Sequence, residues 1–273
     1  MNELIDTWNV ETFDPALLAD LAAHSALIRD YLETSRRQSR EREASTRLMA
    51  YPENPHAGDY IALKERLMGI MASRTIRAWH YTRMTDDEVH GIRQNGVHLS
   101  TLETIRARLA RQVAAGHITE EVAERLFADS PFQGDQHSAR TGKFWMVSNP
   151  IMTTASGVKR LLASWGGEAA YFWQQDSKLE LLLTTIGLPR VLEIAMPLAH
   201  SRHSYQAAES VVATYARTLG CHPDGGSFDL YSQSALGPEA ILDVHSEGDE
   251  SFTQFARGYP AEYIAVDANG DDD

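Results

Sequence analysis

The chain has 273 residues, 43% of them hydrophobic and 23% charged, and a formal net charge of −13. This composition is typical of a soluble globular protein, and the negative charge disfavours indiscriminate binding to nucleic acid, which depends on neutralising phosphates. No segment has the roughly 18 uninterrupted apolar residues of a membrane helix. The acidic N-terminus lacks a signal-peptide pattern, and a single cysteine, Cys221, fits a reducing compartment. We therefore expect a cytoplasmic protein that does not contact membranes; the alternative is an effector exported by a specialised machine, which would show the same features.

The first 72 residues are expected to form a helical N-terminal region. From Pro15 to about Arg42, leucine and isoleucine recur at helical spacing, and a second helix is predicted from Asp59 to Met71. Four basic residues cluster on the second half of the first helix: Arg36, Arg37, Arg40 and Arg42. Most charge clusters of this kind are solvated helix faces, and the alternative is contact with an anionic partner.

The next segment predicts a strand, a capped helix and a further extended run. Polar and apolar residues alternate from Arg74 to Thr82, as in a strand, which ends in His80-Tyr81-Thr82. Thr85 and Glu88 form a capping-box pattern that begins a helix, and Asn95-Gly96 is a stop signal that ends it. The apolar residues after this glycine resume an extended conformation.

The middle of the chain is predicted to be mostly helical. Ser100 and Glu103 give a second capping-box pattern, for a helix that runs to about Ala115 and carries Arg106, Arg108 and Arg111. The elements expected after it are, in order, a helix over residues 118–128, a polar loop over 130–140, an aromatic strand over 141–148, a helix over 156–165 and a strand over 168–173.

The last third of the chain is expected to alternate between helices and strands. The predicted elements are a helix over residues 179–186, a strand over 190–197, a helix over 205–219, and extended segments over 228–231, 240–245 and 261–267, followed by an acidic tail over 269–273. His200 and His203 are three residues apart, but no cysteine pair or acidic partner supports them, so no metal site is predicted.

Three of these segments, in this order, resemble the motifs of the ADP-ribosyltransferase superfamily, the group of the poly(ADP-ribose) polymerases and the diphtheria-type toxins. They are His80-Tyr81-Thr82 with the capped helix, Gly142-Lys143-Phe144-Trp145 with the helix after it, and Glu262-Tyr263-Ile264 near the C-terminus. The family usually has tyrosine where this chain has Trp145. The motifs span residues 74–267 and leave the first 72 residues uncovered.

The resemblance implies an α+β fold, with two small, mostly antiparallel sheets forming a split core, surrounded by helices. It implies a catalytic domain over residues 73–268 that uses NAD as a substrate. Cleavage of the nicotinamide–ribose bond develops positive charge at the anomeric carbon, which a carboxylate stabilises. By this resemblance, Glu262 supplies that carboxylate and is preferred to Glu193, the other candidate for the catalytic carboxylate. His80 would position a ribose.

The remaining site residues follow from the same resemblance. The backbone of Tyr81 would bind the nicotinamide amide, and Thr82 and Ser156 would each offer a hydroxyl. Trp145 would stack on the nicotinamide, since a flat apolar ring suits that contact. Phe144 and Tyr171 are alternatives for the stacking ring.

The function implied is mono-ADP-ribosylation of a macromolecular acceptor, either protein or nucleic acid. The family includes intracellular toxins and defence effectors, for which a neutralising partner protein is expected. Two alternatives keep the same residues: an NAD glycohydrolase with water as acceptor, and an inactive NAD- or protein-binding domain. A further alternative is an unrelated α+β domain in which the three motifs are coincidental.

Overall fold

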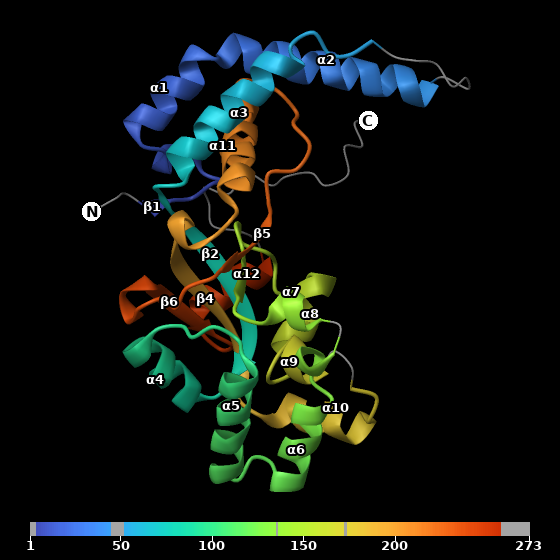
Figure 1. Cartoon of the computed structure of the whole chain (residues 1–273), viewed down its shortest axis with the longest axis vertical. Helices are drawn as coiled ribbons and strands as arrows, with labels where there is room; N and C mark the ends of the chain where they lie inside the picture. The colour runs from blue at the N-terminus through green and yellow to red at the C-terminus, as the bar shows by residue number, and fades with distance from the viewer. Residues whose placement is uncertain (1–3, 45–51, 135, 172–173, 258–273) are drawn as a thin grey trace. The chain divides into compact units, whose positions relative to one another are not determined.

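The computed structural model describes residues 4–44, 52–134, 136–171 and 174–257, which form an α+β protein (Figure 1). The described residues divide into two compact units. Of the described residues, the first unit contains those up to Arg77 together with Pro197–Phe228, and the second contains Ala78–Met196 and 229–257. The first unit is larger than the helical region expected for residues 1–72, because the chain returns to it through residues 197–228. No helix in the described ranges is long and apolar enough to span a membrane.

The first unit is mainly helical, and its longer helices gather around α3 and α11 (Figure 1). Its elements are β1 (Leu4–Ile5), η1 (Val10–Thr12), α1 (Pro15–Ala23), α2 (Ser25–Ala44), α3 (Ala57–Met71), η3 (Leu198–His200) and α11 (Ser204–Thr218). The long helix expected from Pro15 is divided at His24, the C-cap of α1. Leu63 and Leu67 of α3 and Val211 of α11 are buried, so apolar packing joins these helices.

The strands of the second unit belong to a single sheet. These strands are β2 (Thr75–Met84), β3 (Phe144–Val147), β4 (Leu188–Pro197), β5 (Asp229–Ser232) and β6 (Ile241–Ser246), in the order β5-β3-β2-β4-β6. The pairs β2–β3, β3–β5 and β4–β6 are antiparallel, and β1 pairs with the first residues of β2 in parallel. The two-sheet split core is not found among the described strands, because β2 is hydrogen-bonded to both β3 and β4 and so joins the two halves. The strand expected over residues 261–267 lies outside the described residues.

The helices of the second unit lie between these strands in the sequence, except for α12, which follows β6. They are α4 (Asp86–Asn95), α5 (Leu102–Ala114), α6 (Glu120–Ala128), η2 (Pro131–Gln133), α7 (His137–Arg140), α8 (Ser156–Ala163), α9 (Glu168–Tyr171), α10 (Ser177–Thr185), η4 (Pro238–Ala240) and α12 (Glu250–Arg257). Leu109, Leu126, Trp165 and Leu183 belong to one buried cluster. α5, α6, α10 and the segment after α8 therefore share an apolar core.

The capping box at the start of α4 is confirmed. The hydroxyl of Thr85 accepts from the N–H of Glu88 at 3.3 Å, and Glu88 Oε2 accepts from the N–H of Thr85 at 2.8 Å. The box predicted at Ser100 and Glu103 is wrong by one residue. Thr101 is the N-cap of α5 and exchanges hydrogen bonds with Thr104. Ser100 does not cap the helix, because its carbonyl oxygen accepts from the N–H of Gly142 at 2.9 Å in place of the first intrahelical bond.

The strand predicted over residues 168–173 is also wrong over its described part, because Glu168–Tyr171 forms the short helix α9; residues 172–173 lie outside the described residues. Gly166 and Gly167 both have positive φ, 82° and 55°, which turns the chain sharply after α8. The N–H of Tyr171 then donates to the carbonyl oxygen of Gly167 at 3.1 Å and closes a helical turn. The sequence pattern predicted a strand here, whereas the glycine pair determines the local backbone. The helix α12 was not predicted.

Gly187, between α10 and β4, allows a close approach of two backbone segments. Its φ is +66°, and a Cβ atom there would lie 2.4 Å from the backbone carbon and oxygen of Met84, at the end of β2. Gly116, after α5, has a similar φ of +74°, but a Cβ atom added there would meet no atom within 4 Å. Substitutions at the two glycines therefore distinguish the effect of backbone strain alone, at Gly116, from strain combined with steric collision, at Gly187.

We predict that Gly187→Ala destabilises the protein by about 3 kcal/mol or more, because strain at positive φ adds to overpacking against the backbone. Gly116→Ala, the matched control, should cost only about 1–2 kcal/mol, since strain acts alone. Urea unfolding of both variants measures the difference. Equal costs for the two variants would contradict the close approach of β2 and the α10–β4 turn.

Candidate functional site

His80 lies in the second half of β2, and its imidazole tautomer is fixed by the backbone of β3. Nδ1 is 2.8 Å from the carbonyl oxygen of Trp145. A carbonyl oxygen can only accept, so Nδ1 carries the hydrogen and Nε2 of the neutral ring is an acceptor. The ring also packs on Phe144, with the ring centroids 4.5 Å apart. His80 therefore presents a hydrogen-bond acceptor in an orientation set by two contacts to β3.

The surroundings of His80 keep it neutral. Burial lowers the pKa of this histidine to about 4, the bond to the Trp145 carbonyl partly opposes that effect, and the positive charge of Arg108 lowers the pKa further. At neutral pH the ring is therefore uncharged, and the Nε2 lone pair can accept from a hydroxyl group. This state suits positioning of a ligand better than donation of a proton.

Phe144 and Trp145 lie on opposite faces of the sheet, because successive side chains of a strand alternate. The ring of Phe144 contacts His80. Trp145 is opposite Tyr231 in the β3–β5 register, and their rings meet edge to face at 4.7 Å. The structure thus brings Phe144 to His80 and places the Trp145 side chain, which is 40% exposed, on the other face.

The other residues predicted around His80 take different positions. Tyr81 is buried, and its hydroxyl donates to the carbonyl oxygen of Ile151 at 2.8 Å and accepts from the same residue's N–H at 2.6 Å. Thr82 is two residues after His80, hence on the same face of β2, and is also buried. Ser156 is the exposed first residue of α8, and no contact within the described ranges joins it to His80.

Glu262, the predicted catalytic carboxylate, lies outside the described residues. Its rival Glu193 lies in β4 and receives a contact from His245, with Nε2 and Oε1 3.1 Å apart. Tyr171, the alternative stacking ring, is buried in α9 beside the guanidinium of Arg160, 5.4 Å from the ring centroid. In the described part of the chain, Glu193 thus pairs with His245, and Tyr171 packs beside Arg160.

A partly buried network that sequence analysis did not identify surrounds Glu88, the N3 residue of α4. Nε of Arg108, from α5, donates to Glu88 Oε1, and the indole N–H of Trp165 donates to Oε2 at 2.9 Å. The guanidinium carbon also lies over the Trp165 ring, 4.7 Å from the ring centroid. Burial alone would raise the pKa of Glu88, but Arg108 and these hydrogen bonds lower it, so the carboxylate stays ionised.

The sequence contained part of the signal for this network. The capping-box pattern identified Glu88, and the arginine-rich run on α5 included Arg108. The contact between them depends on how α4, α5 and the segment after α8 pack, which local patterns do not determine. Because the charge of Arg108 reaches His80, the network is electrostatically coupled to the candidate site.

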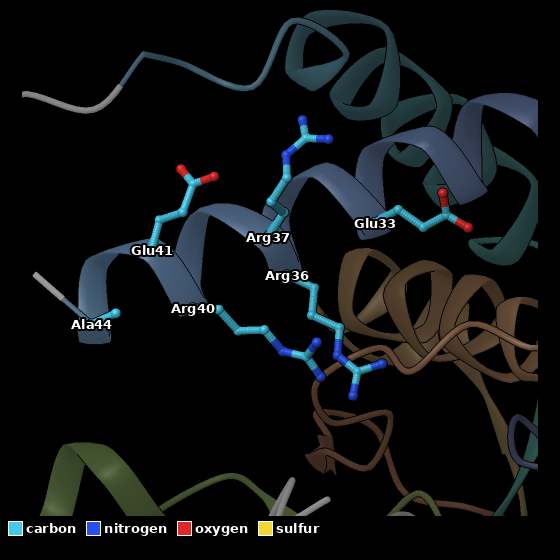
Figure 2. Close-up of a pocket in the computed structure, with 6 residues that line it drawn as sticks. All are labelled: Glu33, Arg36, Arg37, Arg40, Glu41 and Ala44. Carbon is cyan, nitrogen blue, oxygen red and sulfur yellow. The ribbon is translucent and has the colours of Figure 1, made fainter.

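The arginine cluster of α2 forms a separate feature of the first unit. A groove there is lined by Glu33, Arg36, Arg37, Arg40, Glu41 and Ala44 (Figure 2). Arg36 and Arg40 extend from one side of the helix, and Arg37 and Glu41 extend from the other (Figure 2). The described lining residues include neither an aromatic ring nor a histidine, so this groove does not provide the nicotinamide contacts that the resemblance implies.

Neither a metal-binding cluster in the described part of the chain nor a matching family identifies the site. Among the described residues, no group of three or more histidine, cysteine, aspartate or glutamate side chains is arranged to hold a metal ion. Compared with protein-family models, curated proteins and solved structures, the chain gives no significant match. The resemblance to the ADP-ribosyltransferases accordingly stays a prediction from three short motifs.

We predict that His80 makes stability depend on pH. In the unfolded chain its pKa returns to the ordinary value near 6.5, so between pH 6.5 and 4 the unfolded state binds more protons. Stability should therefore fall as the pH falls through this range, by up to about 1.4 kcal/mol per pH unit from this group.

The measurement is urea unfolding of the wild type and His80→Asn from pH 7.5 to 4.5. The asparagine amide can still donate to the Trp145 carbonyl but does not titrate. The free-energy difference between the two proteins should shift in favour of the variant at low pH. A difference that is constant over the whole range would show that His80 is not held neutral.

Proposed function

We propose that this chain is an NAD-dependent mono-ADP-ribosyltransferase that cleaves the nicotinamide–ribose bond and transfers ADP-ribose to an acceptor. The observation that carries the proposal is the state of His80: a neutral imidazole whose Nε2 accepts, at the position of the predicted NAD-binding motif. A ribose hydroxyl is a donor of the kind that such a nitrogen binds. The confirmed capping box of α4 supports the same motif.

The stacking role is assigned here to Phe144 in place of Trp145. Phe144 shares a face of the sheet with His80 and is half-buried, so a flat ligand ring beside the imidazole would meet its apolar surface. Thr82 shares that face as well. Tyr81 contributes through its backbone in this proposal, because its hydroxyl is already bonded to the backbone of Ile151.

The proposed reaction transfers the ribosyl group from one nucleophile to another. The bond between the anomeric carbon and the nicotinamide nitrogen breaks, the electron pair leaves with nicotinamide, and positive charge develops on the ribose. The carboxylate of Glu262 stabilises this charge and takes the proton of the incoming acceptor as the new bond to the anomeric carbon forms. His80 holds a ribose hydroxyl throughout and transfers no proton.

The acceptor class is the part of the proposal that rests on the resemblance alone. A protein or nucleic-acid acceptor and a toxic or defensive role with a neutralising partner are proposed on that basis. Water as acceptor would make the same site an NAD glycohydrolase, since the bond cleaved and the residues needed are the same. An inactive NAD-binding domain would retain the role of His80 and lack that of Glu262.

We predict that the purified protein releases nicotinamide from NAD, alone or with cell lysate as a source of acceptor. Glu262→Gln should lower this rate by about 100-fold or more while NAD binding is retained, because a neutral amide neither stabilises the cation nor accepts the proton. His80→Asn should weaken NAD binding by about tenfold, the value of one lost hydrogen bond to the ligand.

The matched control is His137→Asn. His137 also lies in the second unit, and its Nδ1 is 2.9 Å from a backbone carbonyl oxygen, that of Phe132. This control should change neither NAD binding nor turnover. Nicotinamide release that Glu262→Gln leaves at the wild-type rate would refute the assignment of Glu262, and equal effects of the two histidine variants would refute the role of His80.

A further inference from the structure

We infer that Trp145 and the side chains beside it bind a nucleoside monophosphate, on the face of the sheet opposite to the one that carries His80. The base stacks on Trp145, the phosphate meets the ammonium of Lys143, and the carboxylate of Asp229 accepts from an exocyclic amine of the base. This site is separate from the proposed NAD site, and the inference does not depend on the proposed function.

Trp145 is the exposed member of an aromatic pair at the edge of the sheet. β5 is the last strand in the order β5-β3-β2-β4-β6, and Trp145 of β3 lies opposite Tyr231 of β5. Their ring centroids are 4.7 Å apart, with an angle of 62° between the ring planes. The Trp145 side chain is 40% exposed, and nucleobases stack on exposed aromatic rings of this kind. The pair therefore offers a surface for a flat ligand ring.

Lys143 places a positive charge beside this pair. Its Nζ lies 4.7 Å from the Tyr231 ring centroid and 5.8 Å from that of Trp145. The ammonium donates to the carbonyl oxygens of Ser138 and Ala139, at 3.1 and 2.9 Å. A lysine ammonium has three N–H donors, so these two bonds orient the group and leave one donor for an anion. The lysine is partly exposed, and a ligand can approach it from solvent.

Asp229 places a negative charge at the other end of the pair. It is opposite Val147 in the β3–β5 register and two residues before Tyr231, so it shares a face of the sheet with both aromatic rings. Asp229 is exposed. Lys143 and Val147 are four residues apart, which is roughly 13 Å along an extended strand. The lysine and the aspartate thus flank the aromatic pair.

The order of these groups identifies the class of ligand. The surface presents a cation, a stacking ring and a carboxylate, and a nucleotide whose base has an amine presents a phosphate, a flat ring and an N–H donor. An ammonium forms a charge-assisted bond with phosphate, and an aspartate accepts from the amine of cytosine. A single-stranded nucleic acid is less suitable, because Asp229 and the net charge of −13 repel its further phosphates.

The test is calorimetric titration of the full chain with CMP, whose base is absent from NAD. Cytidine lacks the phosphate and UMP lacks the amine, so both should bind more weakly than CMP. CMP should also quench the fluorescence of Trp145, since the other tryptophans in the described ranges, Trp8, Trp79 and Trp165, are buried. Trp145→Ala should weaken CMP binding about tenfold or more, because the stacking contact is lost.

Two charge variants test the ends of the site. Lys143→Gln should weaken CMP binding about tenfold and leave cytidine binding within about twofold, because the phosphate loses a charge-assisted bond. Asp229→Asn should remove the preference for CMP over UMP, since the amide is both donor and acceptor. The control is Lys159→Gln, at an exposed lysine of α8, which should change the affinity for neither CMP nor cytidine.

Four outcomes would overturn the inference: wild-type protein that does not bind CMP, cytidine that binds as tightly as CMP, and CMP affinity unchanged in a folded variant of either Trp145 or Lys143. Oligocytidylate that binds far more tightly than CMP, with a steep salt dependence, would also overturn it and identify a single-stranded nucleic acid as the ligand. Circular dichroism establishes folding. Trp145→Leu, which keeps an apolar side chain without a ring, carries the test if Trp145→Ala does not fold.

Discussion

The hydrogen bond from His80 Nδ1 to the carbonyl oxygen of Trp145 is the interaction on which the candidate site depends. It crosses between neighbouring strands β2 and β3, so the imidazole orientation is tied to the sheet itself. It also fixes the tautomer, since only a protonated Nδ1 can donate to a carbonyl. Burial then keeps the ring neutral, with a pKa of about 4. Strand pairing thereby determines the chemistry of a side chain.

The Glu88 network connects this imidazole to the helices of the second unit. The capping box that begins α4 also orients the carboxylate which receives Arg108 and Trp165. Glu88, which caps the N-terminus of α4, thus also orients Arg108 from α5. The local sequence signal for helix capping and the placement of a charge beside His80 share one carboxylate. The charge of Arg108 and the hydrogen bonds from Arg108, Thr85 and Trp165 lower the pKa of Glu88, so its carboxylate is ionised although little of it is exposed.

Local patterns predicted the elements that local interactions determine. The strand that contains His80, the box of Thr85 and Glu88, and α3 were recognisable from period and caps. The prediction was wrong at the start of α5, where Ser100 and Thr101 are both candidates for the N-cap. The carbonyl oxygen of Ser100 is bonded to the N–H of Gly142, so Thr101 caps α5 in its place. In the same way, the positive φ of Gly166 and Gly167 leads into a helix where aromatic residues suggested a strand.

The candidate site was predictable only in part, because it depends on register and packing. His80 was recognised from its motif, but the choice between Phe144 and Trp145 requires knowing which face of β3 meets the imidazole. Arg108 could not be assigned, since its partner is twenty residues away on another helix. The single sheet likewise follows from β2 pairing on both sides, which no local pattern encodes.

The most direct test of the central claim is ¹⁵N NMR of the His80 imidazole, with and without NAD, at neutral pH. The account predicts a neutral ring protonated at Nδ1, with an Nε2 resonance that shifts on NAD addition as that nitrogen accepts a hydrogen bond. His80→Asn identifies the signals by their loss. An imidazolium, a ring protonated at Nε2, or an Nε2 resonance unchanged by saturating NAD would contradict it.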